Sequence, residues 1–316
     1  MEQGNNRLLI LSRDSAQYED LVRGAHLPDL EIFSFDTAEE ALEYVEGCNI
    51  ILGEPRRVAP VVDRARKLVW LQSTFAGVEV LVAPSMRSDY VLTGVKGVFG
   101  PIMSEYVFAY ILARERHLFE TRENQKKRIW EEIPCQGLKN SLLGICGTGS
   151  IGAHIARTAR LFGMEVWGYT RSGKAKGDID RVFDQTHFTD FLAGPDYVVI
   201  TLPSTPETFH LFDLDAFLAM KDSAVLINVG RGDIVSEPDL ARALEKGAIR
   251  GAVLDVFEEE PLPEKSPLWT MPEVLITPHN AALSFPEDIV GIFAENYKRF
   301  LKGEPFINTI DFKKGY

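Results

Sequence analysis

Three side chains that can handle charge or protons each follow an apolar, β-branched run of the sequence. Arg231 follows AVLINVG, Glu260 lies just past GAVLDVF, and His279 ends VLITPH. A guanidinium can hold a carboxylate through two parallel hydrogen bonds, and an imidazole supported by a carboxylate can donate a proton near neutral pH. Reduction of a carbonyl needs one proton on oxygen as hydride reaches carbon. We therefore expect these residues to form a catalytic set that acts on an organic acid.

Each of the three residues also has an ordinary interpretation. A lone arginine at a strand end is commonly a surface or ion-pair residue, and His279 could be a loop histidine. Glu260, in the run EEEP, could be one of three solvated acids. Arg231 stands between Gly230 and Gly232, which we expect to give the backbone freedom and clearance. Because the carboxyl ends of parallel strands share one edge with a glycine-rich turn, the set as a whole favours a functional site.

The glycine-rich turn is GICGTGSIG, which has the spacing GxGxxG. It follows one strand-like run, opens a helix-like run and precedes a second strand within about 30 residues, which is typical of a dinucleotide-binding turn. Gly147 would allow the tight turn, Gly149 the approach of a pyrophosphate, and Gly152 close packing of helix on strand. An ordinary βα turn is the alternative. We assign dinucleotide contacts to Gly147, Thr148, Gly149, Ser150, Ile151 and Gly152.

The strand after this turn ends in GYTRSGKAK instead of an acidic residue. A carboxylate at that place would accept from the ribose 2′-hydroxyl of NAD, and it would repel the 2′-phosphate of NADP. Thr170, Arg171 and Ser172 stand there, and Lys174 and Lys176 follow. Arg171 could hold the phosphate in a forked contact, so we expect NADP as cofactor, with NADPH preferred over NADH. A solvated basic loop is the alternative.

Short strand-like runs alternate with helix-like runs along nearly the whole chain. This pattern predicts an α/β fold whose parallel sheets are covered by helices on both faces. Eleven strands are too many for one sheet in a chain of this length, so we expect two doubly wound parallel sheets. The expected strands are residues 7–12, 30–35, 49–53, 67–73, 90–95, 142–147, 164–170, 197–203, 224–230, 251–257 and 274–280.

The boundary between the two expected domains lies near Pro101. This proline can open a helix in its first turn, and apolar residues from Met103 to Leu118 recur at roughly helical spacing. A second long helix, from Pro286 through Lys302, could return the chain to the first sheet. We expect a first domain of residues 1–99 and 286–316, a second domain of residues 100–285, and a cleft between them.

The overall composition narrows the class of protein. The chain has 316 residues and a net charge of −12, which argues against nucleic-acid binding because no basic surplus replaces phosphate counterions. No apolar run approaches the roughly 20 residues that span a bilayer, and the start has no signal or transit pattern. Cys48, Cys135 and Cys146 form no CxxC pair, which favours reduced thiols over disulfides or a zinc site. We expect a cytoplasmic protein without a metal.

At the glycine-rich turn and the three candidate catalytic residues, the sequence resembles the D-isomer-specific 2-hydroxyacid dehydrogenase family. The segments GICGTGSIG, MKDSAVLINVGRGDIVSEPDLARAL, GAVLDVFEEEPLP and VLITPHNA carry the resemblance, which covers nearly the whole chain. It implies a Rossmann cofactor domain, a flavodoxin-like substrate domain, and hydride transfer between NADPH and C2 of a small 2-oxo or D-2-hydroxy acid. Arg231 would bind the substrate carboxylate and keto oxygen, Glu260 would orient and polarise His279, and His279 would donate the proton.

The resemblance implies further contacts in both domains. LQSTFAGVEVL resembles the family's substrate loop, in which backbone amides around Phe75, Ala76, Gly77 and Val78 hold the carboxylate. The remaining cofactor contacts that it implies are Leu202, Pro203 and Thr208 at the adenosine, Val229 and Gly230, and Asp255 at the nicotinamide end.

The departures from the family pattern bear on substrate and function. Thr170-Arg171-Ser172 resembles the NADPH-preferring glyoxylate/hydroxypyruvate reductase branch, so glyoxylate, hydroxypyruvate or a relative is the expected substrate. Asn-Ala-Ala, instead of a glycine pair, follows His279. The family includes corepressor-like members, so an NAD(P)H-sensing interaction protein is the alternative, although the intact Arg–Glu–His set favours an enzyme. By resemblance we expect a homodimer through the cofactor domain, with residues 119–137, including Trp130, as the candidate arm.

Overall fold

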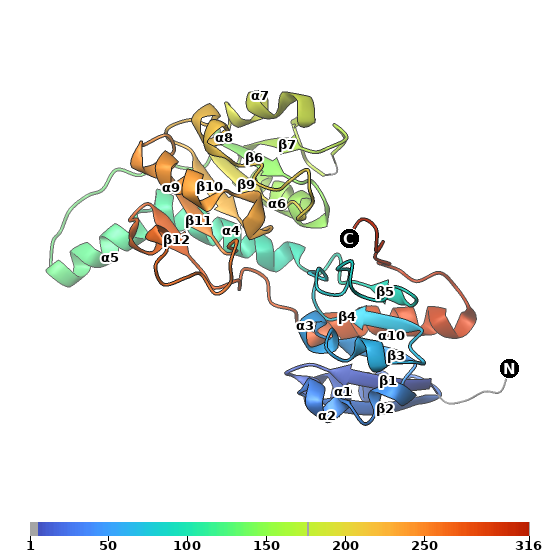
Figure 1. Ribbon diagram of the computed structural model, residues 1–316. Helices are drawn as coiled ribbons and strands as arrows, with labels where there is room; N and C mark the ends of the chain where they lie inside the picture. Colours follow the sequence, from blue (N-terminus) through green and yellow to red (C-terminus); the bar gives the residue numbers. More distant parts are fainter. Residues whose placement is uncertain (1–5, 176, 316) are drawn as a thin grey trace. The chain divides into compact units, whose positions relative to one another are not determined.

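The structure, a computed structural model, describes residues 6–175 and 177–315. The chain forms two compact units (Figure 1). The first unit is Met1–Val98 with Ser284–Tyr316, and the second is Phe99–Leu283. The bounds expected from the sequence are 1–99 with 286–316 and 100–285, and the functions assigned to the two domains remain predictions at this point.

The first unit is built on a five-stranded parallel sheet in the order β2-β1-β3-β4-β5. This is the flavodoxin-like order, and it confirms the expected fold of this part of the chain. The strands are β1 (Asn6–Leu11), β2 (Leu30–Phe35), β3 (Ile50–Gly53), β4 (Trp70–Ser73) and β5 (Val91–Thr93). The helices are α1 (Ser15–Gly24), α2 (Ala38–Ala41), α3 (Pro55–Val58) and α10 (Pro286–Lys302), with 3₁₀ turns η1 (Val45–Gly47) and η2 (Val62–Arg64).

Helix α10, from the end of the chain, completes the core of the first unit. The Trp70 ring of β4 stacks on Phe293, with 5.0 Å between ring centroids, and its centroid also lies 5.0 Å from that of Phe306. The buried Asn296 amide donates to Gln72 Oε1 (3.2 Å). Because buried polar groups need partners, this contact fixes α10 against β4.

The second unit is built on a seven-stranded parallel sheet in the order β12-β11-β10-β9-β6-β7-β8. The strand order reverses between β6 and β9, as in a Rossmann fold, which confirms the expected cofactor-domain architecture. The strands are β6 (Leu142–Cys146), β7 (Glu165–Tyr169), β8 (Arg181–Phe183), β9 (Tyr197–Ile200), β10 (Val225–Asn228), β11 (Gly251–Leu254) and β12 (Val274–Ile276). The helices are α4 (Gly100–Glu115), α5 (Leu118–Lys127), α6 (Ser150–Leu161), α7 (Phe188–Leu192), α8 (Leu214–Ala219) and α9 (Glu237–Glu245), with 3₁₀ turns η3 (Gln185–His187), η4 (Gly232–Ile234) and η5 (Pro267–Thr270).

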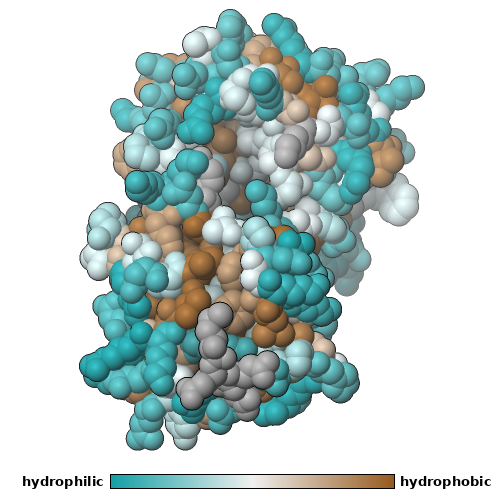
Figure 2. Space-filling view, turned by 90° about the vertical axis from the view of Figure 1, so that its right-hand side faces the viewer, coloured by the Kyte–Doolittle hydropathy of each residue, from teal (hydrophilic) through white to brown (hydrophobic). Residues whose placement is uncertain are grey.

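The central strands of this sheet are buried along their whole length. All residues of β9, β10 and β11 are buried, which explains why these runs are apolar in the sequence apart from Asn228 at the end of β10. Burial of each large aliphatic side chain contributes about 1.5–3 kcal/mol. Hydrophilic side chains predominate on the face drawn in Figure 2, with hydrophobic patches between them. Among the described residues, no helix is long and apolar enough to cross a membrane.

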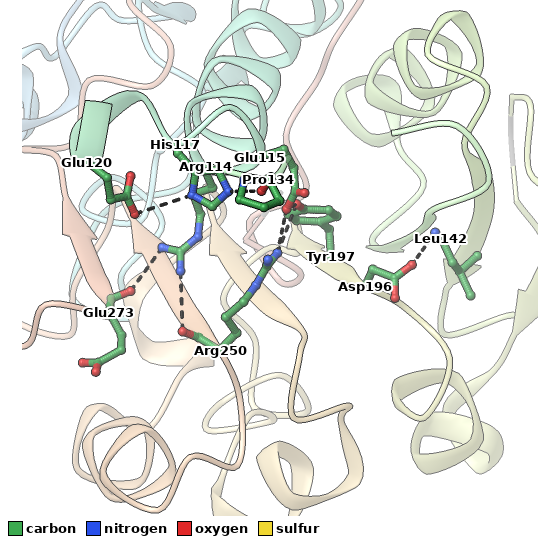
Figure 3. A network of polar contacts seen from close by, with 10 residues as sticks. All are labelled: Arg114, Glu115, His117, Glu120, Pro134, Leu142, Asp196, Tyr197, Arg250 and Glu273. Atoms are coloured by element: carbon green, nitrogen blue, oxygen red, sulfur yellow. Dashed lines mark hydrogen bonds and ion pairs between the residues drawn. The ribbon is translucent and has the colours of Figure 1, made fainter. Parts of the chain in front are cut away.

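A polar network fixes the end of α4 to the amino edge of the seven-stranded sheet (Figure 3). Glu115, the last residue of α4, accepts from the Tyr197 hydroxyl and from Arg250 Nη2 (2.8 Å). Arg114 donates to the carbonyl of Glu273 (3.3 Å). Tyr197 begins β9, and Arg250 and Glu273 directly precede β11 and β12, so three strands hold the helix end.

Helix α5 and the loop after it extend away from the seven-stranded sheet (Figure 1). The prediction that one helix contains the apolar residues from Met103 to Leu118 is wrong at its end. Helix α4 ends at Glu115, and His117 adopts the left-handed region (φ 50°). Leu118 begins α5 instead and is 58% exposed.

The eleven expected strands are all confirmed, although several end earlier than expected. The predicted strand 197–203, for example, ends at Ile200, and Leu202 and Pro203 lie in a loop. A twelfth strand, β8, was not expected. It has three residues at the edge of the sheet and begins with an arginine, so its sequence has no apolar run to detect.

Candidate active site

The carboxyl ends of four strands bring the glycine turn and the three expected catalytic residues to one edge of the second unit. The glycine turn follows β6, Arg231 follows β10, Glu260 follows β11 and His279 follows β12. Strands β10, β11 and β12 are hydrogen-bonded neighbours and run parallel. The parallel register of this sheet therefore places the three residues at one edge, and the expected convergence of their side chains stays a prediction.

The three glycines of the turn have three different surroundings. Gly147 has φ +96°, which L side chains rarely adopt. A Cβ on Gly152 would lie 2.1 Å from the carbonyl oxygen of Gly147, so only glycine lets α6 start this close to β6. A Cβ on Gly149 would meet no atom within 4 Å, and α6 begins at the next residue, Ser150. The open space at the N-terminus of a twelve-residue helix fits a pyrophosphate group.

The glycines on either side of Arg231 give clearance to neighbouring chain segments. A Cβ on Gly232 would lie 1.9 Å from the carbonyl carbon of Phe257, and one on Gly230 would lie 2.9 Å from the carbonyl oxygen of Leu202. Neither glycine has a positive φ. The expectation that they supply backbone freedom is therefore wrong, and the expectation of clearance is right.

Asn228 organises the turn that presents Arg231, a role that was not expected from the sequence. Its fully buried side chain accepts from the Gly230 amide (3.1 Å) and donates to the Arg231 carbonyl (2.9 Å). The half-buried Arg231 side chain donates from Nη1 to the Gly230 carbonyl (2.8 Å). A single amide residue in the otherwise apolar run AVLINVG was the available signal, because a buried Asn needs partners.

Glu260 and His279 form a direct pair. His279 Nδ1 lies 2.8 Å from Glu260 Oε2, and the other carboxylate oxygen accepts from the Phe257 amide (3.2 Å). An ionised carboxylate only accepts, so Nδ1 carries hydrogen and Nε2 is the ring nitrogen left to serve a substrate. The His279 side chain is 54% exposed and that of Glu260 is 23% exposed. An imidazole held in this way by a carboxylate can act as a proton donor.

Asp255 is buried, and its observed contacts are with the loop that carries His279. Its carboxylate accepts from Thr277 Oγ1 (2.6 Å) and from the amides of Asn280 (2.9 Å) and Ala281 (3.0 Å). Its carbonyl accepts from the His279 amide (2.8 Å). The expected contact of Asp255 with the nicotinamide end of a cofactor stays a prediction.

The residues expected at a 2′-phosphate lie just beyond β7. The Thr170 hydroxyl is buried and has no hydrogen-bond partner in the described parts of the chain, while Arg171 and Ser172 are exposed. The pKa of Glu207 is lowered by hydrogen bonds to its own amide and to Thr205 and also by the charge of Arg171. The exposed Arg171 guanidinium and Ser172 hydroxyl are donors of the kind that a phosphate group accepts from. Lys176 lies outside the described residues.

The segment expected under an adenosine forms a tight turn. Thr208 Oγ1 accepts from the Thr205 amide (2.9 Å) and donates to the Pro203 carbonyl (2.8 Å). Leu202 is half-buried, and Val229 is 6% exposed in the second unit's core. These contacts give the turn a fixed shape, and its adenosine contact remains a prediction.

The predicted substrate loop of the first unit follows β4. Ser73 Oγ donates to the Phe75 carbonyl (2.7 Å) and accepts from the Phe75 amide (3.0 Å). The Phe75 amide is thus engaged within its own loop, so the expected carboxylate contact depends on the amides of Ala76, Gly77 and Val78. The Phe75 and Ala76 side chains are exposed, and that of Val78 is buried.

Comparison with known proteins identifies the family. A sequence profile described as D-isomer specific 2-hydroxyacid dehydrogenase, NAD binding domain, matches residues 108–281. Glyoxylate/hydroxypyruvate reductase A of Photorhabdus laumondii subsp. laumondii is 36% identical over 214 residues, which is 68% of each chain.

Two crystal structures show the same likeness over nearly the whole chain. A D-isomer specific 2-hydroxyacid dehydrogenase family protein of Aeromonas salmonicida is 49% identical with a TM-score of 0.95, and the match covers 98% of this chain and 99% of that one. The NADPH-dependent glyoxylate/hydroxypyruvate reductase of Sinorhizobium meliloti, in complex with NADP and sulfate, is 28% identical with a TM-score of 0.87, and the match covers 98% of this chain and 100% of that one. The chain therefore belongs to the D-isomer specific 2-hydroxyacid dehydrogenase family.

Proposed function

We propose that the protein is an NADPH-dependent reductase of small 2-oxo acids, which it converts to 2-hydroxy acids. The observation that carries this proposal is the Glu260–His279 pair, 2.8 Å apart, at the strand edge that also holds Arg231 and the glycine turn. Relatives named glyoxylate/hydroxypyruvate reductase support glyoxylate and hydroxypyruvate as the substrate class. The reverse reaction, oxidation of a D-2-hydroxy acid, uses the same groups.

Each residue of the site has a separate role in the proposed reaction. When bound, NADPH supplies the hydride that reaches C2 of the oxo acid. Arg231 binds the substrate carboxylate and orients the keto oxygen, while the amides of Ala76, Gly77 and Val78 stay a predicted substrate contact of the first unit. His279 Nε2 donates the proton to the keto oxygen. Glu260 accepts from Nδ1–H, which holds the ring in place with Nε2 left to face the substrate.

The cofactor is NADP, with NADPH preferred over NADH. Gly149 leaves room for the pyrophosphate, and Thr170, Arg171 and Ser172 bind the 2′-phosphate. The complex of the Sinorhizobium meliloti relative with NADP supports this assignment. An NADPH-dependent enzyme whose three cysteines are free thiols suits a reducing cytoplasm.

A panel of 2-oxo acids tests the proposed reaction. Oxidation of NADPH should follow addition of glyoxylate, hydroxypyruvate or a related acid. His279→Ala should lower kcat by about 10²–10⁴, because general acid catalysis contributes that much, while the Kd for NADPH stays within about twofold. Turnover that survives in His279→Ala would contradict the assigned proton donor. Tight NADPH binding with no turnover across the panel would favour the NAD(P)H-sensing alternative.

Replacement of Arg171 tests the cofactor preference separately. Arg171→Ala should lower the ratio of kcat/KM for NADPH to that for NADH by about ten- to a hundredfold, since a charge-assisted hydrogen bond to the phosphate is lost. The value for NADH should hardly change. A wild type that prefers NADH would refute NADP use and leave the proposed reaction intact.

We also propose a homodimer that forms through the α5 segment of the second unit. None of the residues of α5 is buried. The adjoining Trp130 is 97% exposed and Ile129 is 48% exposed. Apolar residues exposed together on a projecting segment are typical of a protein–protein interface, and the partner proposed here is a second copy of the chain.

A further inference from the structure

A continuous chain of hydrogen bonds connects helix α4 to the loop that carries His279. The Tyr106 hydroxyl of α4 lies 2.6 Å from Thr277 Oγ1, and Thr277 Oγ1 lies 2.6 Å from Asp255 Oδ1. The Asp255 carboxylate also accepts from the amides of Asn280 and Ala281. Three elements of the sequence, α4 and the ends of β11 and β12, are thus joined at one buried carboxylate.

The number of hydroxyl protons decides which group donates in each of these hydrogen bonds. A threonine hydroxyl has one proton, and here it goes to the Asp255 carboxylate, which can only accept. Tyr106 must therefore donate to Thr277, which requires a neutral phenol. Burial raises the pKa of Tyr106 well above its ordinary range, and the nearby charge of Asp255 adds to this effect. Tyr106 is therefore a fixed donor at the start of the chain.

His279 lies between Thr277 and Asn280, two residues that hydrogen-bond to the Asp255 carboxylate. Its backbone adopts φ 51°, in the left-handed region, which costs an L residue about 1–2 kcal/mol. Its amide donates to the carbonyls of Asp255 (2.8 Å) and Thr277 (3.1 Å). Such a conformation persists only when the surroundings hold it, and here hydrogen bonds hold the residues on both sides. The ring position that meets Glu260 depends on this backbone.

We propose that Tyr106 is a positioning residue for the proton donor, acting through Thr277 and Asp255 to hold the His279 loop. The proposal rests on the proposed function, because it assigns the purpose of the loop to proton delivery by His279. Tyr106 itself touches neither His279 nor Glu260 through any hydrogen bond in the described chain. Its effect should therefore appear in proton transfer and not in binding.

Tyr106→Phe removes only the hydroxyl and should lower kcat by about three- to tenfold, the equivalent of one hydrogen bond. The KM for the oxo acid and the Kd for NADPH should stay within about twofold. The solvent deuterium isotope effect on kcat should rise, because proton delivery becomes slower relative to the other steps. Thr277→Val should have a larger effect of the same kind, and Thr277→Ser, which keeps the hydroxyl, should restore most of the wild-type rate.

Tyr110→Phe is the matched control. Tyr110 lies one turn further along α4, with its ring centroid 4.7 Å from that of Tyr106, and its hydroxyl has no hydrogen bond within the described residues. This variant should have wild-type kcat and isotope effect. If Tyr110→Phe lowers kcat as much as Tyr106→Phe does, the effect belongs to helix packing and the proposal is wrong.

Hydrogen exchange gives a readout that needs no cofactor or turnover. The amides of Asn280 and Ala281 should exchange faster in Tyr106→Phe and in Thr277→Val than in wild type, because their carboxylate acceptor loses an anchor. Unchanged exchange with unchanged isotope effects would overturn the proposal. A wild type that reduces no 2-oxo acid would instead refute the proposed function, and the exchange result would still report whether Tyr106 holds the loop.

Discussion

Gly232 and Gly149 belong to the same unit, yet they are glycines for different reasons. At Gly232 the space for a side chain is already filled by the backbone of Phe257. At Gly149 the space is open, and the backbone conformation (φ −72°, ψ −159°) suits any L residue. The first glycine serves the fold, and the second serves the proposed cofactor.

Alanine substitutions should separate these two roles. Gly232→Ala should lower the free energy of unfolding by at least about 2 kcal/mol, because a methyl group there forces the backbone to move. Gly149→Ala should change the stability of the cofactor-free protein by less than about 0.5 kcal/mol and weaken NADPH binding about tenfold or more. Chemical denaturation and cofactor titration measure the two effects. A Gly149→Ala protein that binds NADPH normally would remove the pyrophosphate from this turn.

At the scale of elements, α4 is fixed at its far end by the Glu115 network (Figure 3). Parallel strands place this network at the amino edge of the sheet, whereas the candidate active site lies at the carboxyl edge. The network therefore belongs to stability and not to the reaction.

Glu115→Ala should lower the free energy of unfolding by about 1–3 kcal/mol, because the Tyr197 hydroxyl and the Arg250 guanidinium lose their shared acceptor. Its kcat/KM should equal that of wild type when measured well below the unfolding temperature. Glu295→Ala is the control, since its exposed carboxylate pairs with Arg299 one turn further along α10, away from this network and from α5, and its unfolding midpoint should hardly change. Loss of activity in folded Glu115→Ala would show that the two edges are coupled.

The elements that could be predicted from the sequence are those with a strong local pattern. The buried strands β9 and β11 are continuous apolar runs, and β10 is apolar up to Asn228. Helix α10 begins at the predicted Pro286 and ends at the predicted Lys302. Strand β8 has no such pattern.

The candidate site also contains residues that the sequence pattern reveals and contacts that it does not. Arg231, Glu260 and His279 could be found because strand ends in parallel sheets share an edge. The loop-holding contacts of Asp255 could not be found, because two of its donors are backbone amides whose positions depend on the fold of residues 280 and 281. The contacts of Asn228 depend in the same way on a turn conformation that no residue type reveals.

At the scale of the whole molecule, the exposed α5 segment predicts association. Light scattering should give the mass of two chains for wild type, and Trp130→Asp should give the mass of one, because a charge at the centre of an apolar contact is costly. Trp269→Asp is the control, since Trp269 is also exposed (51%) but lies in η5, away from α5 in the sequence. A single-chain mass for wild type at micromolar concentration would contradict the dimer.

The contact between Asn296 and Gln72 joins residues 224 positions apart. During synthesis on the ribosome, β4 emerges long before α10. Until α10 is made, Trp70 lacks its stacking partner Phe293, and Gln72 lacks its donor Asn296. The second unit is one uninterrupted stretch, Phe99–Leu283, and meets no such delay. The nascent chain should therefore complete the second unit first, and strands β1 to β5 should stay exposed to chaperones until α10 has left the exit tunnel.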